Sequence, residues 1–310
     1  MAVRASLLGV CALVATGIAL AQTPPSPPQQ QRGGTYVEPP AQVDPLYVPL
    51  GPDRPAAPPS PDSVLTLRLS LEAPLRNGQA AGAGTQGPRA GSTTVQAQLR
   101  WRPLEDRAWF VQGTAFRYLE PSRQRSWDPD FTYGFGHDDG REGHWAFAYA
   151  NYTGTRRHPD VAQGEQRWNF PQGQWTAAYR FGLPEALRPW LLVGDGDAAS
   201  CHADGNLVPR YTRLAGDVGS DKVSFALGCR YTRPGGWFAQ ATAFAWPEPR
   251  KQQPWDPDFT YGFGWTDPGS SGLTLQYANY SGNRWPGRAR APGEGQFRSG
   301  SISVGWGASW

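Results

Sequence analysis

Apolar and polar residues alternate with period two along most of the chain after residue 62. In the segment 92–102, for example, the odd positions from Val95 to Trp101 are apolar and the even positions from Gln96 to Arg102 are polar. Alternation of this kind is typical of a β-strand with one apolar and one polar face. The pattern predicts twelve strands, at about 64–72, 92–102, 107–119, 130–136, 143–153, 172–182, 189–195, 223–231, 235–247, 258–265, 271–281 and 296–310.

The lengths of these segments and of the connections between them indicate a membrane barrel. Most segments are close to the 9–11 residues that a tilted strand needs to cross a bilayer. Short connections near 103–107, 137–143, 183–188, 232–235 and 265–271 alternate with long ones near 73–91, 120–130, 153–172, 196–220, 247–257 and 281–295. Outer-membrane barrels combine short periplasmic turns with long outer loops in this way. We therefore predict an all-β fold, a single closed antiparallel transmembrane β-barrel of about 12 strands. The segment 206–214 is an alternative position for the seventh strand, because 189–195 is short.

An internal repeat divides the barrel into two halves. The ten residues Trp127–Gly136 recur letter for letter at Trp255–Gly264, and Tyr149–Tyr152 recurs at Tyr277–Tyr280 with the same offset of 128. Several blocks in one register indicate an internal duplication. We predict a six-strand unit present twice, as repeat 1 at 63–188 and repeat 2 at 189–310.

The residues before the barrel predict export. Arg4 precedes an apolar run from Leu7 to Leu20, and Ala19-Leu20-Ala21 has the pattern of a cleavage site, so residues 1–21 are expected to be a signal peptide. A lipoprotein signal at Cys11 is the weaker alternative, because this cysteine lies inside the apolar run. Residues 22–62 are rich in Pro and Gln and are expected to form a disordered periplasmic segment. No later stretch of about 18 residues is apolar throughout, which argues against a transmembrane helix.

The last strand adds a further signal. Apolar residues alternate along it from Ile302 to the terminal Trp310. With the signal peptide and the strand pattern, residues 63–310 resemble bacterial outer-membrane β-barrel proteins of the porin-like, 12-stranded class. The resemblance implies an outer-membrane location in a Gram-negative bacterium, contact with outer-membrane lipid, and recognition by the barrel-assembly machinery through the strand that ends at Trp310. An interfacial aromatic girdle is expected at Trp109, Trp145, Trp190 and Trp237.

Charge and cysteine content exclude some functions. The formal charge of +3 is too small to suggest a nucleic-acid partner. Cys201 and Cys229 remain after the signal peptide, and both a disulfide and two unpaired thiols are open. We expect no metal and no cofactor, because the chain has no His-x-x-x-His or Cys-x-x-Cys spacing. We also expect no enzymatic activity. His137 and His144 lie by a predicted periplasmic turn, His158 and His202 lie in long loops without an evident Ser or Asp arrangement, and none of the four has a counterpart in the second copy.

Arginines on the polar faces of the strands are the first candidate site. With the apolar face toward lipid, the opposite face lines the lumen, because charged residues are costly on the lipid side. Guanidinium groups attract anions and pair bidentately with carboxylate, sulfate or phosphate. This arrangement resembles the arginine-tracked twelve-strand porins that pass acidic sugars. Alternatively, the arginines brace a narrow lumen by pairing with loop acids such as Asp128 or Asp195. The candidate residues are Arg68, Arg100, Arg102, Arg180 and Arg230.

The repeated Trp-Asp-Pro-Asp motif is the second candidate. The sequence places it where a long outer loop enters a strand, and its carboxylates are suited to a cation or to sugar hydroxyls beside a Trp ring. The favoured interpretation is a turn, in which Asp-Pro sets the bend and the second Asp accepts backbone N–H groups. The neighbouring strand ends at an Asn-Tyr pair that we expect to contact this turn. The residues concerned are Trp127, Asp128, Asp130, Asn151 and Tyr152, with Trp255, Asp256, Asp258, Asn279 and Tyr280 in the second copy.

Three functions fit this sequence. The first is a small channel with an arginine-lined lumen that favours anionic solutes or acidic saccharides. The second is a non-conducting surface or assembly barrel that binds polysaccharide or a partner, for example in exopolysaccharide export. The third, least favoured, is a secreted β-sandwich lectin built by duplication.

Overall fold

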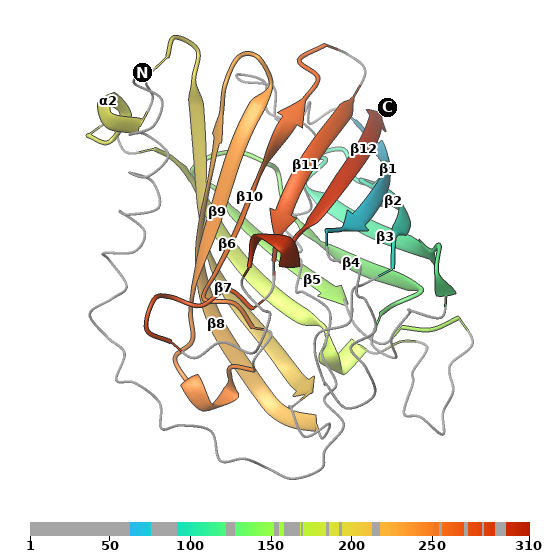
Figure 1. Cartoon of the computed structure of the whole chain (residues 1–310). Helices are drawn as coiled ribbons and strands as arrows, with labels where there is room; N and C mark the ends of the chain where they lie inside the picture. The colour runs from blue at the N-terminus through green and yellow to red at the C-terminus, as the bar shows by residue number, and fades with distance from the viewer. Residues whose placement is uncertain are drawn as a thin grey trace.

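The chain forms one closed antiparallel barrel of twelve strands, in which each strand pairs with its neighbours in sequence and β12 closes on β1 (Figure 1). The computed structural model describes residues 63–75, 92–121, 128–151, 155–157, 168, 170–183, 186–191, 194–212, 218–253, 256–269, 272–280, 282–288 and 296–310. The strands are β1 (Leu65–Pro74), β2 (Thr94–Trp101), β3 (Trp109–Tyr118), β4 (Phe131–His137), β5 (Trp145–Asn151), β6 (Gln174–Gly182), β7 (Ala198–Thr212), β8 (Val218–Thr232), β9 (Trp237–Ala245), β10 (Phe259–Thr266), β11 (Leu273–Asn279) and β12 (Ser301–Ser309).

Helical structure is confined to short elements between the strands. They are η3 (Phe170–Gln172), α2 (Arg188–Leu191), η4 (Pro249–Lys251) and η5 (Phe297–Ser299). In the part of the chain that the structure describes, no helix has the length and apolar character needed to cross a membrane.

The barrel has apolar side chains on its outside and polar side chains on its inside, the reverse of a water-soluble domain. Large apolar side chains such as Leu99, Phe147 and Leu275 are exposed on the outer wall, whereas polar side chains such as Thr176 and Gln276 are buried on the inner face. Burial of polar groups beneath an exposed apolar wall is unusual in water and is what lipid requires of a barrel. The fold is therefore that of a transmembrane β-barrel of the outer-membrane type. A two-sheet sandwich lectin is excluded, because all twelve strands belong to one closed sheet.

Pairing of the first and last strands closes the barrel. Residues of β1 from Thr66 to Pro74 pair with residues of β12 from Ser309 back to Ser301, and Leu71 lies opposite Val304. This register places apolar beside apolar on the outside and polar beside polar on the inside. Every barrel strand thus has two neighbours, so the sheet leaves no open edge toward lipid.

The predicted position of the seventh strand at 189–195 is wrong, although the predicted number of strands is confirmed. Residues Arg188–Leu191 form the short helix α2, and the seventh strand is β7, which contains most of the alternative segment 206–214. Pro189 suits the first turn of a helix and cannot donate a ladder hydrogen bond. Gly196 then takes a φ of 80°, which most other residues adopt only with strain.

The long outer loop predicted at 196–220 is wrong for a related reason. β7 and β8 are 15 residues each and pair from Ala198 with Thr232 to Thr212 with Val218, so the connection between them is only 213–217. The two strands extend below the others in Figure 1 as a projecting hairpin. Conversely, the connection between β6 and β7, residues 183–197, is longer than the short turn predicted at 183–188.

Elsewhere the short and long connections alternate as predicted. β2–β3, β4–β5, β8–β9 and β10–β11 are joined by short turns at the end of the barrel where β12 finishes, which we call the short-turn end. The opposite end is called the long-loop end. Trp109, Trp145 and Trp237 begin β3, β5 and β9 at the short-turn end and are exposed, as expected of an interfacial girdle. Trp190 lies in α2 instead.

The two copies of the repeated motif occupy equivalent places six strands apart. The identical segments lie on β4 and β10, and each neighbouring strand carries a tyrosine under a short helix. The Tyr149 hydroxyl donates to the Phe170 carbonyl oxygen at 2.8 Å, and the Tyr277 hydroxyl donates to the Phe297 carbonyl oxygen at 2.7 Å. The paired rings stack with centroids 4.4 and 4.3 Å apart. The same tyrosine–phenylalanine contact therefore occurs at two places in the barrel that lie six strands apart.

Cys201 and Cys229 form a disulfide, which resolves the alternative that the sequence left open. They are cross-strand partners on β7 and β8. Leu183 and Phe181 pack against them near the short-turn end. The bond therefore links β7 to β8 at the end of the barrel opposite the projecting tip of this hairpin.

Candidate functional site

The five arginines predicted to line the lumen lie at one end of the barrel. Each is within three residues of the point where its strand reaches the short-turn end. They come from β1, β2, β6 and β8, with one directly after β2, and lie on the inner face, opposite the exposed apolar positions. We call this set the arginine belt: Arg68, Arg100, Arg102, Arg180 and Arg230.

A buried acid in the β4–β5 turn braces the belt. Asp138 is 1% exposed, and Arg180 donates to both of its carboxylate oxygens, at 2.6 and 3.0 Å. Burial raises the pKa of Asp138, but the positive charge and hydrogen bonds of Arg180, the charge of Arg100 and the Gly140 N–H outweigh it, so the pKa lies below its ordinary value. Asp138 is thus ionised, and it has the bracing role that the sequence suggested for Asp128 or Asp195.

Other belt members are held by aromatic rings and amides. The Arg100 guanidinium lies 4.1 Å from the centre of the Phe110 ring, and its Nε donates to Gln112 Oε1 at 3.1 Å. Arg230 lies in the same way over Phe238, at 4.0 Å. Cation–π contacts of this kind orient a guanidinium while keeping its charge. The belt is therefore preorganised by the wall that carries it.

Arg102 is fixed at the turn that follows β2. Its Nη1 donates to the Arg107 carbonyl oxygen at 2.6 Å, and Arg107 has a positive φ of 53°. Burial lowers the pKa of Arg102, and Asp138 opposes this by favouring the charged form. A guanidinium remains protonated near neutral pH even so.

The belt leaves an excess of positive charge at the short-turn end. Of the acids with buried side chains among the described residues, Asp256 and Asp258 lie in the outer loops, and Asp197, whose side chain is 1% exposed, pairs with Arg233 outside the belt at 3.5 Å. The others include Asp138 and Asp204, against five arginines. Asp204 lies 3.4 Å from His202 on β7. A preorganised cationic ring can attract carboxylate, sulfate or phosphate groups.

We expect Asp138→Asn to remove a pH-dependent part of the barrel's stability. Because the folded-state pKa of Asp138 is lowered, its ionised form stabilises the barrel above about pH 4, and this contribution is lost as the pH falls through the folded-state value. The measurement is the temperature at which the folded band shifts on a gel, between about pH 6 and about pH 3. Glu105→Gln, in an exposed turn at the same end, is the control. Parallel pH profiles for the wild type and Asp138→Asn would contradict this assignment.

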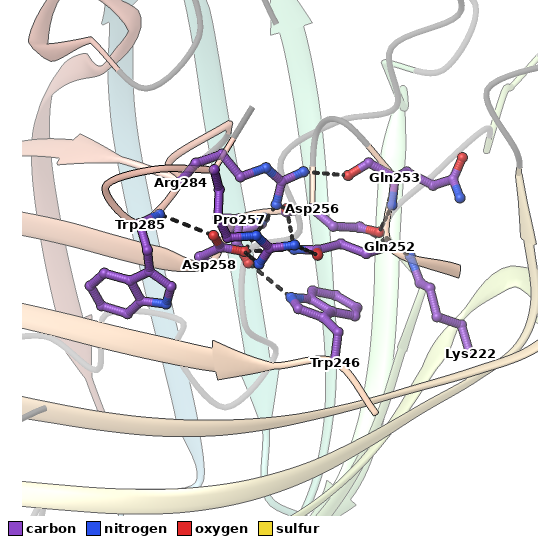
Figure 2. Close-up of polar contacts among 10 residues, drawn as sticks. Lys222, Trp246, Gln252, Gln253, Asp256, Pro257, Asp258, Arg284 and Trp285 are labelled. Atoms are coloured by element: carbon purple, nitrogen blue, oxygen red, sulfur yellow. Dashed lines mark hydrogen bonds and ion pairs between the residues drawn. The ribbon is translucent and has the colours of Figure 1, made fainter. Parts of the chain in front are cut away.

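The second candidate, the repeated Trp-Asp-Pro-Asp motif, lies at the long-loop end and is bound by the chain's own groups (Figure 2). Asp256 accepts two contacts of 3.0 Å from the Lys222 ammonium and the Gln253 N–H at 2.7 Å. Lys222 lies in the part of β8 that extends beyond its pairing with β9, so this pair joins the projecting hairpin to the β9–β10 loop. Trp127, Tyr152 and Trp255 lie outside the described residues.

Asp258 is the centre of this network. Its carboxylate accepts Arg288 at 2.6 Å and Arg284 at 3.2 Å. The Trp285 N–H reaches it at 3.0 Å and the Gln252 amide at 2.8 Å (Figure 2). The side chain is 0% exposed. Four donors therefore occupy a carboxylate that the sequence also allowed as a ligand for a cation or sugar.

The first copy repeats part of this geometry. Asp130 accepts Arg156 at 3.2 Å and the Arg157 N–H at 3.0 Å. Its carbonyl oxygen accepts the Phe116 N–H at 2.9 Å, and the corresponding bond from Phe244 to Asp258 is 2.8 Å. In both copies, the second aspartate of the motif bonds loop arginines and lies directly before a strand. This favours the interpretation of the motif as a turn over that of a ligand site. Sequence reasoning missed Arg156 and Arg284, although they recur at the same offset of 128.

The Asn-Tyr pairs lie beside these turns. In the second copy the Asn connects to the turn and the Tyr bonds to a residue of the lumen. Asn151 and Asn279 are fully buried. Asn279 connects to the turn through Asn283, whose amide donates to Asn279 Oδ1 at 3.1 Å and whose carbonyl oxygen accepts the Asp258 N–H at 2.7 Å. Tyr280 accepts a 3.0 Å hydrogen bond from Gln276, a buried lumen-facing residue. In the described ranges, no cluster of three His, Cys, Asp or Glu side chains is suited to hold a metal ion.

Comparisons with known proteins add no family name. No family model and no curated protein matches the chain. Two similar solved structures are the NanC porin (TM-score 0.36) and Salmonella typhi OmpF in complex with daunomycin (TM-score 0.30). Each is 9% identical and covers 79% of this chain, and the matches span 98% and 97% of those chains. The assignment of the fold rests on this chain's own strand pairing.

Proposed function

We propose that this protein is a non-enzymatic outer-membrane channel of a Gram-negative bacterium that favours small anionic solutes, acidic saccharides among them. The observation that carries the proposal is the arginine belt on the inner face at the short-turn end. The belt holds five cations, and the acids with buried side chains outside the outer loops include Asp138, which pairs with Arg180, Asp204, and Asp197, which pairs with Arg233. Charge of one sign inside a low-dielectric wall concentrates the opposite ion in a pore.

The outer-membrane location is supported by features along the whole chain. The signal-peptide pattern at 1–21 predicts export, and the barrel presents an apolar wall to lipid. β12 exposes Ile302, Val304 and Trp306 on that wall, in the alternating pattern that suits recognition by the assembly machinery. Short turns at one end and long loops at the other fit a periplasmic and an outer side.

The proposal is tested by the reversal potential of the purified full-length barrel in a planar bilayer under a salt gradient. We expect anion preference in the wild type, because the belt enriches anions. We expect Arg68→Gln combined with Arg230→Gln to move the permeability ratio toward one. Arg141→Gln combined with Arg250→Gln, which removes the same two charges from exposed positions, is expected to leave it unchanged. Cation preference, or the absence of conductance, would overturn the proposal.

A second function is favoured by a different observation. Many side chains that point into the barrel are buried, among them Asn206, Thr242 and Gln276, so much of the lumen is filled. A filled lumen suits a non-conducting surface or assembly barrel whose outer loops bind polysaccharide or a partner, for example in exopolysaccharide export. A barrel that carries no current but binds surface polysaccharide, and loses that binding when 247–257 is deleted, would support this function.

A further inference from the structure

Among the described residues, the middle of the inner face is more accessible to solvent on one side of the barrel than on the other. Along β5 to β11 the lumen-facing residues in the middle of the strands are buried, as Thr176, Asn206 and Gln276 show. Along β12, β1 and β2, and at Thr114 of β3, the equivalent residues are half-buried and reach solvent. We call the following set of accessible residues the seam strip, because it flanks the closure between β1 and β12: Arg68, Ser70, Gln96, Gln98, Thr114 and Ser303.

The cause of this asymmetry is the composition of β12. Its lumen-facing positions hold only serine and glycine, from Ser301 to Ser309. A Cβ added at Gly305 would meet no atom nearer than 3.6 Å, and one at Gly307 none nearer than 3.5 Å. At Gly264, by contrast, an added Cβ would collide with the Leu275 carbonyl oxygen and lie 2.8 Å from the Phe238 ring. The space inside the barrel is therefore open beside β12 and tight beside β10.

The seam strip carries hydroxyl and amide groups between two charges. Arg68 lies toward the short-turn end, and Glu72 lies four residues further along β1, about 13 Å away at the rise of an extended strand. Gln96 donates to Glu72 at 2.9 Å and Ser301 donates to it at 2.6 Å, so this acid is held by the wall. Gln98 reaches Thr114 at 3.4 Å. Groups that both donate and accept hydrogen bonds suit sugar hydroxyls.

We propose that solute crosses the barrel off-centre along the seam strip, and that the strip recognises hydroxyl-rich solutes whose acidic group meets Arg68. This inference rests on the proposed channel function and adds the path and the contacts. It also divides the arginine belt. Arg68 meets the solute, whereas the buried Arg100 and Arg102 act through their electric field and through packing.

The path is tested by thiol labelling in the full-length barrel, with Gln98→Cys as the probe and Gln276→Cys as the matched control. Both are lumen-facing glutamines, but Gln276 is buried on the filled side. Cys201 and Cys229 are joined, and Cys11 lies in the predicted signal peptide, so the processed barrel is expected to carry no competing thiol. We expect a methanethiosulfonate reagent that carries a sulfonate to label Gln98→Cys and to lower its conductance. We expect Gln276→Cys to be neither labelled nor blocked.

The outcomes separate this inference from the channel function. A wild-type barrel that carries no current overturns the proposed function and the path with it. A conducting barrel that Gln98→Cys labelling leaves unblocked, or that Gln276→Cys labelling blocks, overturns the path alone. Gly305→Phe provides a second test, because its ring would enter the open space and is expected to reduce conductance while the folded band is retained.

The chemistry of the solute is tested by current block with glucuronate, glucose and acetate. We expect glucuronate to block most strongly, because it has both hydroxyls for the strip and a carboxylate for Arg68. Arg68→Gln is expected to reduce the block by glucuronate to that of glucose, while Arg100→Gln should not. Acetate that blocks as well as glucuronate would contradict recognition of hydroxyls. An unchanged block in Arg68→Gln would contradict the role of Arg68.

Discussion

Asp258→Ala is expected to destabilise the barrel by about 3–5 kcal/mol, the cost of removing one partner from a buried ion pair. The carboxylate is fully buried and accepts hydrogen bonds from Arg284 and Arg288. Because the Arg284 side chain is 8% exposed, its charge would remain buried without that partner. The Trp285 N–H would lose its acceptor as well. The loss of stability therefore comes mainly from the groups left behind.

The measurement is urea unfolding in detergent or lipid, followed by tryptophan fluorescence. Asp130→Ala makes a graded comparison, because the Asp130 side chain is 27% exposed, and a smaller loss is expected. Glu248→Ala, which removes an exposed pair with Lys251, should change the unfolding free energy by less than about 0.5 kcal/mol. If Asp258→Ala cost no more than Glu248→Ala, the outer-loop network would not contribute to stability as we describe.

Leu71→Arg is expected to destabilise the inserted barrel by about 2–4 kcal/mol, the range for arginine on the lipid face near the bilayer midplane. Leu71 is 43% exposed and lies between Val95 and Val304 on the neighbouring strands. An arginine there would carry its charge into hydrocarbon unless it reached the interface. The measurement is the fraction folded in vesicles across a urea series.

Ser70→Arg is the matched control, because it adds the same side chain one residue away on the lumen face. We expect that variant to insert normally and to conduct less, since Ser70 belongs to the seam strip. Equal effects of Leu71→Arg and Ser70→Arg on folding would contradict the assignment of the outer wall to lipid.

Charge is distributed unevenly along the axis of this barrel. The arginine belt concentrates positive charge at the short-turn end, with Arg180 and Asp138 as its fixed point. At the long-loop end, Lys222 pairs with Asp256, and Arg284 and Arg288 pair with Asp258. We therefore assign the proposed anion preference to the belt and the positioning of the outer loops to this network.

Several features could be predicted because they depend on neighbouring residues in the chain. Alternation along 92–102 assigns Leu99 to the outside and Arg100 to the inside, and the structure agrees. The number of strands, closure into one barrel and the girdle positions of Trp109, Trp145 and Trp237 follow from the same local pattern. The seventh strand was placed at 189–195, with 206–214 only as the alternative, because β7 contains glycine, proline and an aspartate and its alternation is weak.

The sequence by itself determined which residues face lipid and which face the lumen, because that choice has a period of two and needs no knowledge of distant residues. Only the tertiary structure decided which lumen residues meet. Arg180 and Asp138 are 42 residues apart in sequence, and Cys201 and Cys229 are 28 apart; each pair is set by the register between strands. The accessible side of the lumen was decided in the same way, because the Ser and Gly face of β12 opens space only where closure places it beside β1.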